Sequence, residues 1–202
     1  MTEPRVEAIL LAAGESRRMG RPKPLIELAG RTFIAAISDA ILAAVPRLII
    51  VLGADAERIR PAIPTDPRIV MVENPAYRRG QLSSLKAGLA AISTDADAAL
   101  VHLCDHPLVR AETFRAAIEL YRRTGGPIVI ARYRGRRGHP AIFERSVFPE
   151  LMAAPEAIGA RQVVEADAAR IHYADVEDAG VVQDLDRPDD LKRAGIAPPR
   201  AK

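Results

Sequence analysis

The residues best suited to chemistry lie in one short loop, from Gly14 to Lys23, that follows an apolar run. Its cationic side chains are those of Arg17, Arg18, Arg21 and Lys23. Gly14 and Gly20 let the backbone turn and approach a ligand closely. Cations on a glycine-containing loop at a strand end favour a polyphosphate ligand. The alternative is a turn whose arginines contact only water.

Two well-known phosphate-binding loops do not fit this stretch. The P-loop requires G-x-x-x-x-G-K-[ST], but five residues separate Gly14 from Gly20 and no Ser or Thr follows Lys23. The dinucleotide fingerprint G-x-G-x-x-G is also absent, because Ser16 stands at its second glycine. The loop therefore predicts a polyphosphate site of another kind.

Carboxylates suited to a divalent cation occur at two further places. Asp105 ends an apolar stretch just before His106-Pro107, and Asp184 and Asp186 share one face of a later extended segment. Magnesium prefers one or two carboxylates together with phosphate oxygens. We expect Asp105 and one of the two later aspartates to share a cation. For Asp105 alone, a capping or turn role is the alternative.

The stretch before Asp105 also carries residues that can bind zinc. His102, Cys104 and His106 alternate along one strand. Neighbouring alternate residues diverge too little to surround one ion, and the sequence has no second Cys or His cluster. Packing roles are therefore expected for His102 and Cys104.

Two other stretches are candidates for binding. Gly80 precedes a helix whose first turn contains Ser83 and Ser84, which suits hydrogen bonding to a base edge or, equally well, a serine-capped helix. His139, between Gly138 and Pro140, is either a general base or a histidine in a surface turn. The surface turn is the favoured interpretation.

These residues must be positioned by an alternation of strands and helices. The apolar runs predict strands at Val6–Ala12, Arg47–Leu52, Ile69–Val72, Ala98–Cys104, Pro127–Tyr133, Ala141–Phe143, Arg170–Tyr173 and Val181–Gln183. Helices are predicted at Phe33–Val45, Asp55–Ala62, Gln81–Ile92, Ala111–Arg123, Ser146–Ala153, Ala160–Ala166 and Arg187–Ala194. This order indicates an α/β fold with a mostly parallel sheet.

Ligands of such sheets bind beyond the carboxyl ends of the strands. The loop from Gly14, the turn from Asn74 to Gly80 and Asp105 each follow a strand end. We therefore expect all three to open onto one crevice.

Composition limits the remaining possibilities. The 202 residues fit one domain, predicted over residues 1–196 with a frayed tail at 197–202. A net charge of +3 and 4% aromatic residues do not favour nucleic acid. The single cysteine fits a reducing compartment, and the apolar run before Gly14 is too short to span a membrane. A cytoplasmic protein without nucleic-acid or membrane partners is expected.

Taken together, these segments resemble the MobA-like nucleotidyltransferase family, and within it the molybdenum cofactor cytidylyltransferases. The resemblance rests on five motifs in order, at residues 11–23, 74–85, 103–107, 138–140 and 184–188. It implies a three-layer Rossmann-like nucleotidyltransferase fold with a mostly parallel central sheet. The Ala12-Ala13-Gly14 form is similar to the branch that uses CTP rather than GTP.

The resemblance also implies roles for particular residues. It assigns Arg18 and Lys23 to the triphosphate, Asp105 and Asp186 to an essential Mg²⁺, and His139 and Pro140 to the acceptor. The implied nucleotide-binding residues are Leu11, Ala12, Ala13, Gly14, Ser16, Arg18, Lys23, Asn74, Gly80 and Ser83. The implied catalytic residues are Arg18, Lys23 and Asp105.

The implied reaction transfers CMP from CTP to the phosphate of molybdopterin and releases pyrophosphate. One departure concerns the acceptor, because Ala157 stands where the family often has Asp. Alternatives are another small phosphorylated acceptor with CTP or GTP, a non-catalytic partner or chaperone of a molybdoenzyme, and an oxidoreductase that has reused this fold. The missing dinucleotide fingerprint argues against the last.

Overall fold

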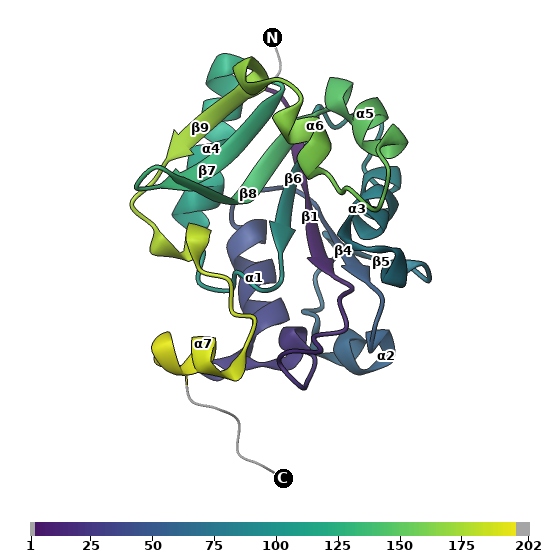
Figure 1. Ribbon diagram of the computed structural model, residues 1–202, viewed down its shortest axis with the longest axis vertical. Helices are drawn as coiled ribbons and strands as arrows, with labels where there is room; N and C mark the ends of the chain where they lie inside the picture. Colours follow the sequence, from purple (N-terminus) through teal and green to yellow (C-terminus); the bar gives the residue numbers. More distant parts are fainter. Residues whose placement is uncertain (1–2, 197–202) are drawn as a thin grey trace.

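The computed structural model describes residues 3–196 and is built around one seven-stranded sheet (Figure 1). In spatial order its strands are β5 (Ile69–Glu73), β4 (Leu48–Leu52), β1 (Val6–Ala12), β6 (Ala98–Leu103), β8 (Arg136–Glu144), β7 (Ile128–Tyr133) and β9 (Ile171–Asp175). All neighbouring pairs are parallel except the two that involve β8. The expected mostly parallel α/β sheet is confirmed.

Helices cover both faces of the sheet, which gives three layers. On one face lie α1 (Phe33–Leu42) and α4 (Ala111–Thr124), and on the other α3 (Gln81–Ala90), α5 (Phe148–Ala153) and α6 (Arg161–Glu165). The short helices α2 (Ala56–Ile59) and α7 (Pro188–Arg193) lie beyond the carboxyl end of β1 (Figure 1).

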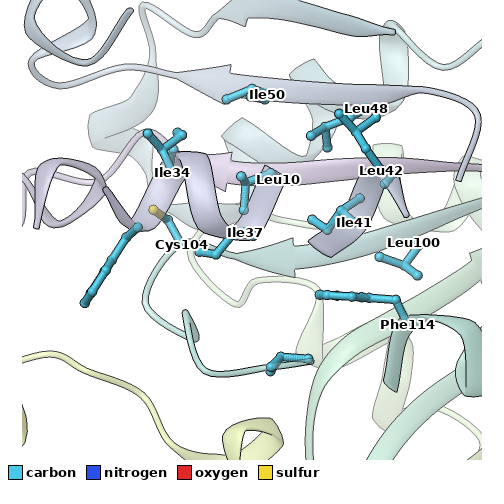
Figure 2. Packing of buried hydrophobic residues seen from close by; sticks show 14 of the residues in the cluster. Leu10, Ile34, Ile37, Ile41, Leu42, Leu48, Ile50, Leu100, Cys104 and Phe114 are labelled. Atoms are coloured by element: carbon cyan, nitrogen blue, oxygen red, sulfur yellow. The ribbon is translucent and has the colours of Figure 1, made fainter. Parts of the chain in front are cut away.

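The central strand β1 explains the layering. All seven of its residues are buried, because alternate side chains enter opposite cores. Leu10 joins Ile37 and Ile41 of α1 (Figure 2), whereas Ile9 packs with the residues of α3. Apart from Glu7, this strand is apolar throughout because it is buried on both faces, which is why the pattern predicted its bounds correctly.

Strand β8 differs from the prediction. The sequence predicted a turn at His139 followed by a short strand at Ala141–Phe143, but the strand extends from Arg136 to Glu144. It forms a hairpin with β7 through Arg134 and Gly135, whose φ angles are positive, as in tight hairpin turns. The first half of β8 is polar, so its sequence does not show the apolar pattern that predicts a strand.

Two other segments also differ. The predicted strand at Val181–Gln183 is part of a 3₁₀ turn, Ala179–Val182. At Gly180 an added Cβ would lie 2.6 Å from the carbonyl oxygen of Leu108, so close packing holds this turn. A small hairpin of β2 (Glu27–Leu28) and β3 (Arg31–Thr32) was not predicted. The proposed tail at 197–202 lies outside the described residues.

Candidate active site

A cleft of about 340 Å³, here called the loop cleft, opens beyond the carboxyl ends of β1 and β6. Its lining includes seven of the residues proposed for nucleotide binding, namely Leu11, Ala12, Ala13, Gly14, Ser16, Lys23 and Gly80, together with Asp105, which was proposed for the metal. The three strand-end segments therefore meet at one crevice, as their positions after the strands predicted.

The cationic loop, residues 14–23, is held by its own hydrogen bonds. Ser16 has a φ of 51°, and its hydroxyl accepts a hydrogen bond from the backbone N–H of Lys23 at 3.0 Å. The buried side chain of Met19 anchors the loop in the core. Arg18 remains exposed at the rim, while Lys23 is turned inward.

Lys23 lies between two carboxylates that are distant in the sequence. Its Nζ is 3.1 Å from Oδ2 of Asp105 and 2.6 Å from Oδ1 of Asp186. Burial alone lowers the pKa of Lys23, but the two carboxylates raise it by more, so the net pKa is raised. The ammonium group therefore carries its charge at neutral pH.

Asp105 retains a free oxygen. Its Oδ1 is buried and has no hydrogen-bond partner within residues 3–196, and Nε2 of His106 is 3.9 Å away. A buried anionic oxygen without a partner is costly, so this atom fits a cation bound with the substrate. No group of three or more His, Cys, Asp or Glu side chains in the described chain could hold a metal alone. Phosphate oxygens of the nucleotide would have to complete the coordination.

The structure distinguishes the two late aspartates. Asp186 reaches the site and also pairs with Arg18, whose Nη1 is 2.5 Å from its Oδ2, whereas Asp184 is exposed. Asp190 holds Asp186 in place, because its Oδ2 accepts hydrogen bonds from the backbone N–H groups of Asp186 and Arg187. Asp186 is therefore the residue placed to share a cation with Asp105.

Asn74 and Ser83 do not line the loop cleft. Asn74 donates hydrogen bonds to the hydroxyl groups of Ser83 and Ser84, each at 3.0 Å, and Ser83 donates to the carbonyl oxygens of Ala76 and Gly80. These two buried residues hold the turn that precedes α3. The cleft wall here consists instead of Tyr77, Gly80, Gln81 and Ser84. Tyr77 and Gln81 were missed in the sequence, although both are close to Gly80.

A second cavity, the β8 cavity, has a volume of about 550 Å³. It shares Leu11 and Gln81 with the loop cleft, so the two spaces adjoin. Most of its wall is apolar, and its other polar side chains are Arg137, His139, Glu156 and Arg161. Pro140 is buried in β8 and is not part of the lining.

His139 does not lie in a surface turn, as the favoured interpretation had it. It belongs to β8, its Nδ1 is buried, and its ring centroid is 5.2 Å from that of His106. Burial and, to a smaller extent, the neighbouring His106 lower the pKa of His139 to about 4. The imidazole is therefore neutral at pH 7.

His102 and Cys104 have packing environments. The ring of His102 stacks edge-on against Phe114 at 5.0 Å, and its Nε2 is 3.1 Å from the carbonyl oxygen of His106. Burial raises the pKa of the Cys104 thiol, so it is not a reactive thiolate.

Comparison with protein families gives a match to a family model described as the MobA-like NTP transferase domain, over residues 8–172. The chain is 28% identical to the molybdenum cofactor cytidylyltransferase of Escherichia coli (strain K12), over 92% of this chain and 93% of that protein. It is 30% identical to the nicotine blue oxidoreductase of Paenarthrobacter nicotinovorans, over 94% of this chain and 96% of that protein.

Among solved structures, Rv0371c of Mycobacterium tuberculosis H37Rv superposes with a TM-score of 0.84 at 29% identity, covering 96% of this chain and 98% of that one. The same mycobacterial protein has been solved in complex with manganese, and that structure superposes with a TM-score of 0.73 at 28% identity, covering 94% of this chain and 97% of that one. A divalent metal therefore binds one structural relative of this chain.

Proposed function

Because this chain belongs to the MobA-like NTP transferase family, we propose that it transfers CMP from CTP to the phosphate of the molybdenum cofactor. An oxygen of the acceptor phosphate forms a bond to the α-phosphorus of CTP. The bond between that phosphorus and the bridging oxygen to the β-phosphate breaks, and pyrophosphate leaves with the electron pair. The product is a cytidine dinucleotide of the cofactor.

The loop cleft suits the donor in this reaction. Both reacting groups are anionic, so the protein must neutralise charge and align the groups more than it must move protons. Lys23 lines the cleft, and the exposed Arg18 lies beside it through its pair with Asp186; in the proposal both bind the triphosphate. Backbone N–H groups of the cationic loop, which lacks side-chain bulk at Gly14, assist them.

Asp105 and Asp186 are the residues that would hold a divalent cation, and we propose Mg²⁺. When bound, the cation neutralises charge that develops on the phosphate oxygens. The unpartnered Oδ1 of Asp105, on a carboxylate whose other oxygen contacts Lys23, is the observation on which this proposal mainly depends.

The proposal is tested by pyrophosphate release. The protein is incubated with Mg²⁺, molybdopterin cofactor and either CTP or GTP, and release is expected with CTP. Release with GTP alone would overturn the base preference. No release with either nucleotide would remove the molybdenum cofactor as acceptor, and a screen of other phosphorylated acceptors with labelled CTP would follow.

A second candidate is favoured by one relative, the nicotine blue oxidoreductase, which matches nearly the full length of the chain. A reductase of this fold would take hydride from a nicotinamide cofactor and pass it to a ring in the β8 cavity. The cationic loop has Ser16 at the second glycine of the dinucleotide fingerprint, which argues against this candidate. Titration of NAD(P)H fluorescence tests it, because an oxidoreductase must bind that cofactor.

A further inference from the structure

Glu156 lies on the wall of the β8 cavity, between α5 and α6, and its side chain is only 19% exposed. It is the one acidic side chain that lines this cavity in the described part of the chain. The surrounding wall consists largely of aliphatic residues together with Phe143. A carboxylate in such surroundings requires hydrogen-bond donors.

The protein satisfies only one oxygen of Glu156. Oε2 pairs with Nε of Arg79 at 2.6 Å, whereas Oε1 has no hydrogen-bond partner among residues 3–196. The nearby arginines are otherwise engaged, because Arg137 and Arg161 both contact Oε1 of Glu165, at 2.6 and 2.9 Å. Among the described residues, Glu156 is thus the carboxylate on the cavity wall, and the protein leaves its Oε1 available to a ligand.

The cavity chemistry restricts what this ligand is. A purely aliphatic ligand would leave Glu156 unpaired, and an anionic group next to it would be repelled. A polyhydroxylated sugar would place its hydroxyls against aliphatic walls. A heteroaromatic ring with N–H donors on one edge satisfies both the apolar wall and the carboxylate, since a carboxylate accepts two parallel hydrogen bonds from such an edge.

We propose that Glu156 determines acceptor specificity, by accepting hydrogen bonds from the N–H edge of a heteroaromatic ring in the β8 cavity. This inference rests on the proposed function, because it makes the β8 cavity the acceptor site. Leu11 and Gln81 line both cavities. In this proposal the ring of the acceptor lies in the β8 cavity, and its phosphate extends past these two residues into the loop cleft. Glu156 would also supply a carboxylate one position before Ala157, which stands where the family often has Asp.

Direct binding tests the inference without turnover. Pterin and lumazine are fluorescent bicyclic rings that differ at one position, where the amino donor of pterin is replaced by a carbonyl in lumazine. The protein contains no tryptophan, so their fluorescence can be followed without interference from indole. The wild-type protein is expected to bind pterin roughly tenfold or more tightly than lumazine, the effect of a hydrogen bond to a charged group.

Two variants separate recognition from structural support. Glu156→Gln keeps the shape of the side chain but replaces one oxygen with a donor, and is expected to lose the preference for pterin while CTP affinity stays unchanged. Arg79→Gln breaks the ion pair but leaves the carboxylate, and is expected to keep the preference. Equal binding of pterin and lumazine to the wild-type protein, or an equal loss in both variants, would overturn the inference.

The same variants separate this inference from the proposed function. If pyrophosphate is released, Glu156→Gln should raise KM for the acceptor roughly tenfold and leave KM for CTP unchanged. If none is released but pterin is still preferred, the nucleotidyl transfer proposal fails and the ring-binding role of Glu156 stands.

Discussion

Two carboxylates near opposite ends of β1 are satisfied to different degrees. At the first end, the fully buried Glu7 accepts hydrogen bonds from Arg5, Arg47 and the backbone N–H of Ser93. Beyond the carboxyl ends of β1 and β6, the half-buried Asp105 has one oxygen on Lys23 and one with no hydrogen-bond partner in the described chain. A carboxylate that is fully hydrogen-bonded within the protein stabilises the fold, whereas a carboxylate oxygen without a partner is available to bind a ligand.

The largest effect is expected from Asp105→Asn. Removing the anionic oxygen should lower pyrophosphate release by roughly 10²–10³-fold, by analogy with loss of one preorganised electrostatic contact. The free energy of unfolding should change by less than about 0.5 kcal/mol, because Lys23 keeps its ion pair with Asp186 and the Oδ1 of Asp105 has no hydrogen bond to lose. Both are measured on the same preparation, by a coupled pyrophosphate assay and by urea denaturation.

Asp184→Asn is the matched control for that variant, since Asp184 is a nearby but exposed aspartate. Its activity should equal that of the wild-type protein. Retained activity in Asp105→Asn, or a loss in both variants, would remove Asp105 from the proposed metal site.

The opposite result is expected from Glu7→Gln. Loss of the charge leaves Arg47 poorly paired, so the free energy of unfolding should fall by about 2 kcal/mol. Activity per folded molecule should stay unchanged because Glu7 is at the far end of the strand. Asp95→Asn, which breaks an exposed pair with Arg5, is the control and should cost less than about 0.5 kcal/mol. If the two variants are equally stable, the buried network is not a stabilising one.

Lys23→Met tests whether the ammonium and a divalent cation compete for the same carboxylates. Without nucleotide, Mn²⁺ affinity measured by electron paramagnetic resonance should rise roughly tenfold, because a positive charge between Asp105 and Asp186 has been removed. CTP affinity measured by calorimetry should fall in the same variant. Arg17→Met removes an exposed cation of the same loop and should leave Mn²⁺ affinity unchanged; a decrease in Mn²⁺ affinity in Lys23→Met would contradict the competition.

The smallest effect concerns acid stability. Burial alone raises the pKa of Glu7, but the hydrogen bonds from Ser93 and Arg47 together lower it below its ordinary value of 4.5. The stabilisation is therefore complete above the pKa of the unfolded chain and is lost as the pH falls through the lowered folded value. The difference in unfolding free energy between wild type and Glu7→Gln should shrink from pH 6 to pH 3. If this difference in unfolding free energy does not change with pH, the stabilisation comes from the shape of the Glu7 side chain rather than from its charge.

The sequence predicted the parallel strands and the loop cleft better than the rest. Val6–Ala12 and Leu48–Leu52 are strands buried on both faces, so their apolar runs coincide with the elements. The position of Asp105 followed from the rule that parallel strands end at one edge. The choice between Asp184 and Asp186 depended on contacts with Lys23 and Asp190, which no pattern displays.

The acceptor side was harder to predict because its elements do not have periodic sequences. The first half of β8 is polar, so His139 was taken for a turn residue, whereas it lies in a strand next to buried rings. Glu156 lies in a loop, and the partner of its carboxylate, Arg79, is far away in the sequence. Such contacts are set by tertiary packing rather than by local propensity.

The late position of Asp186 has a consequence for synthesis of the protein. Lys23 and Asp186 are 163 positions apart along the chain, and the strands that carry Asp105 and the cationic loop emerge from the ribosome long before Asp186. Domains generally fold as units during synthesis, so the site is completed only when the last part of the chain has been made. A chain interrupted before residue 186 would lack the carboxylate pair altogether.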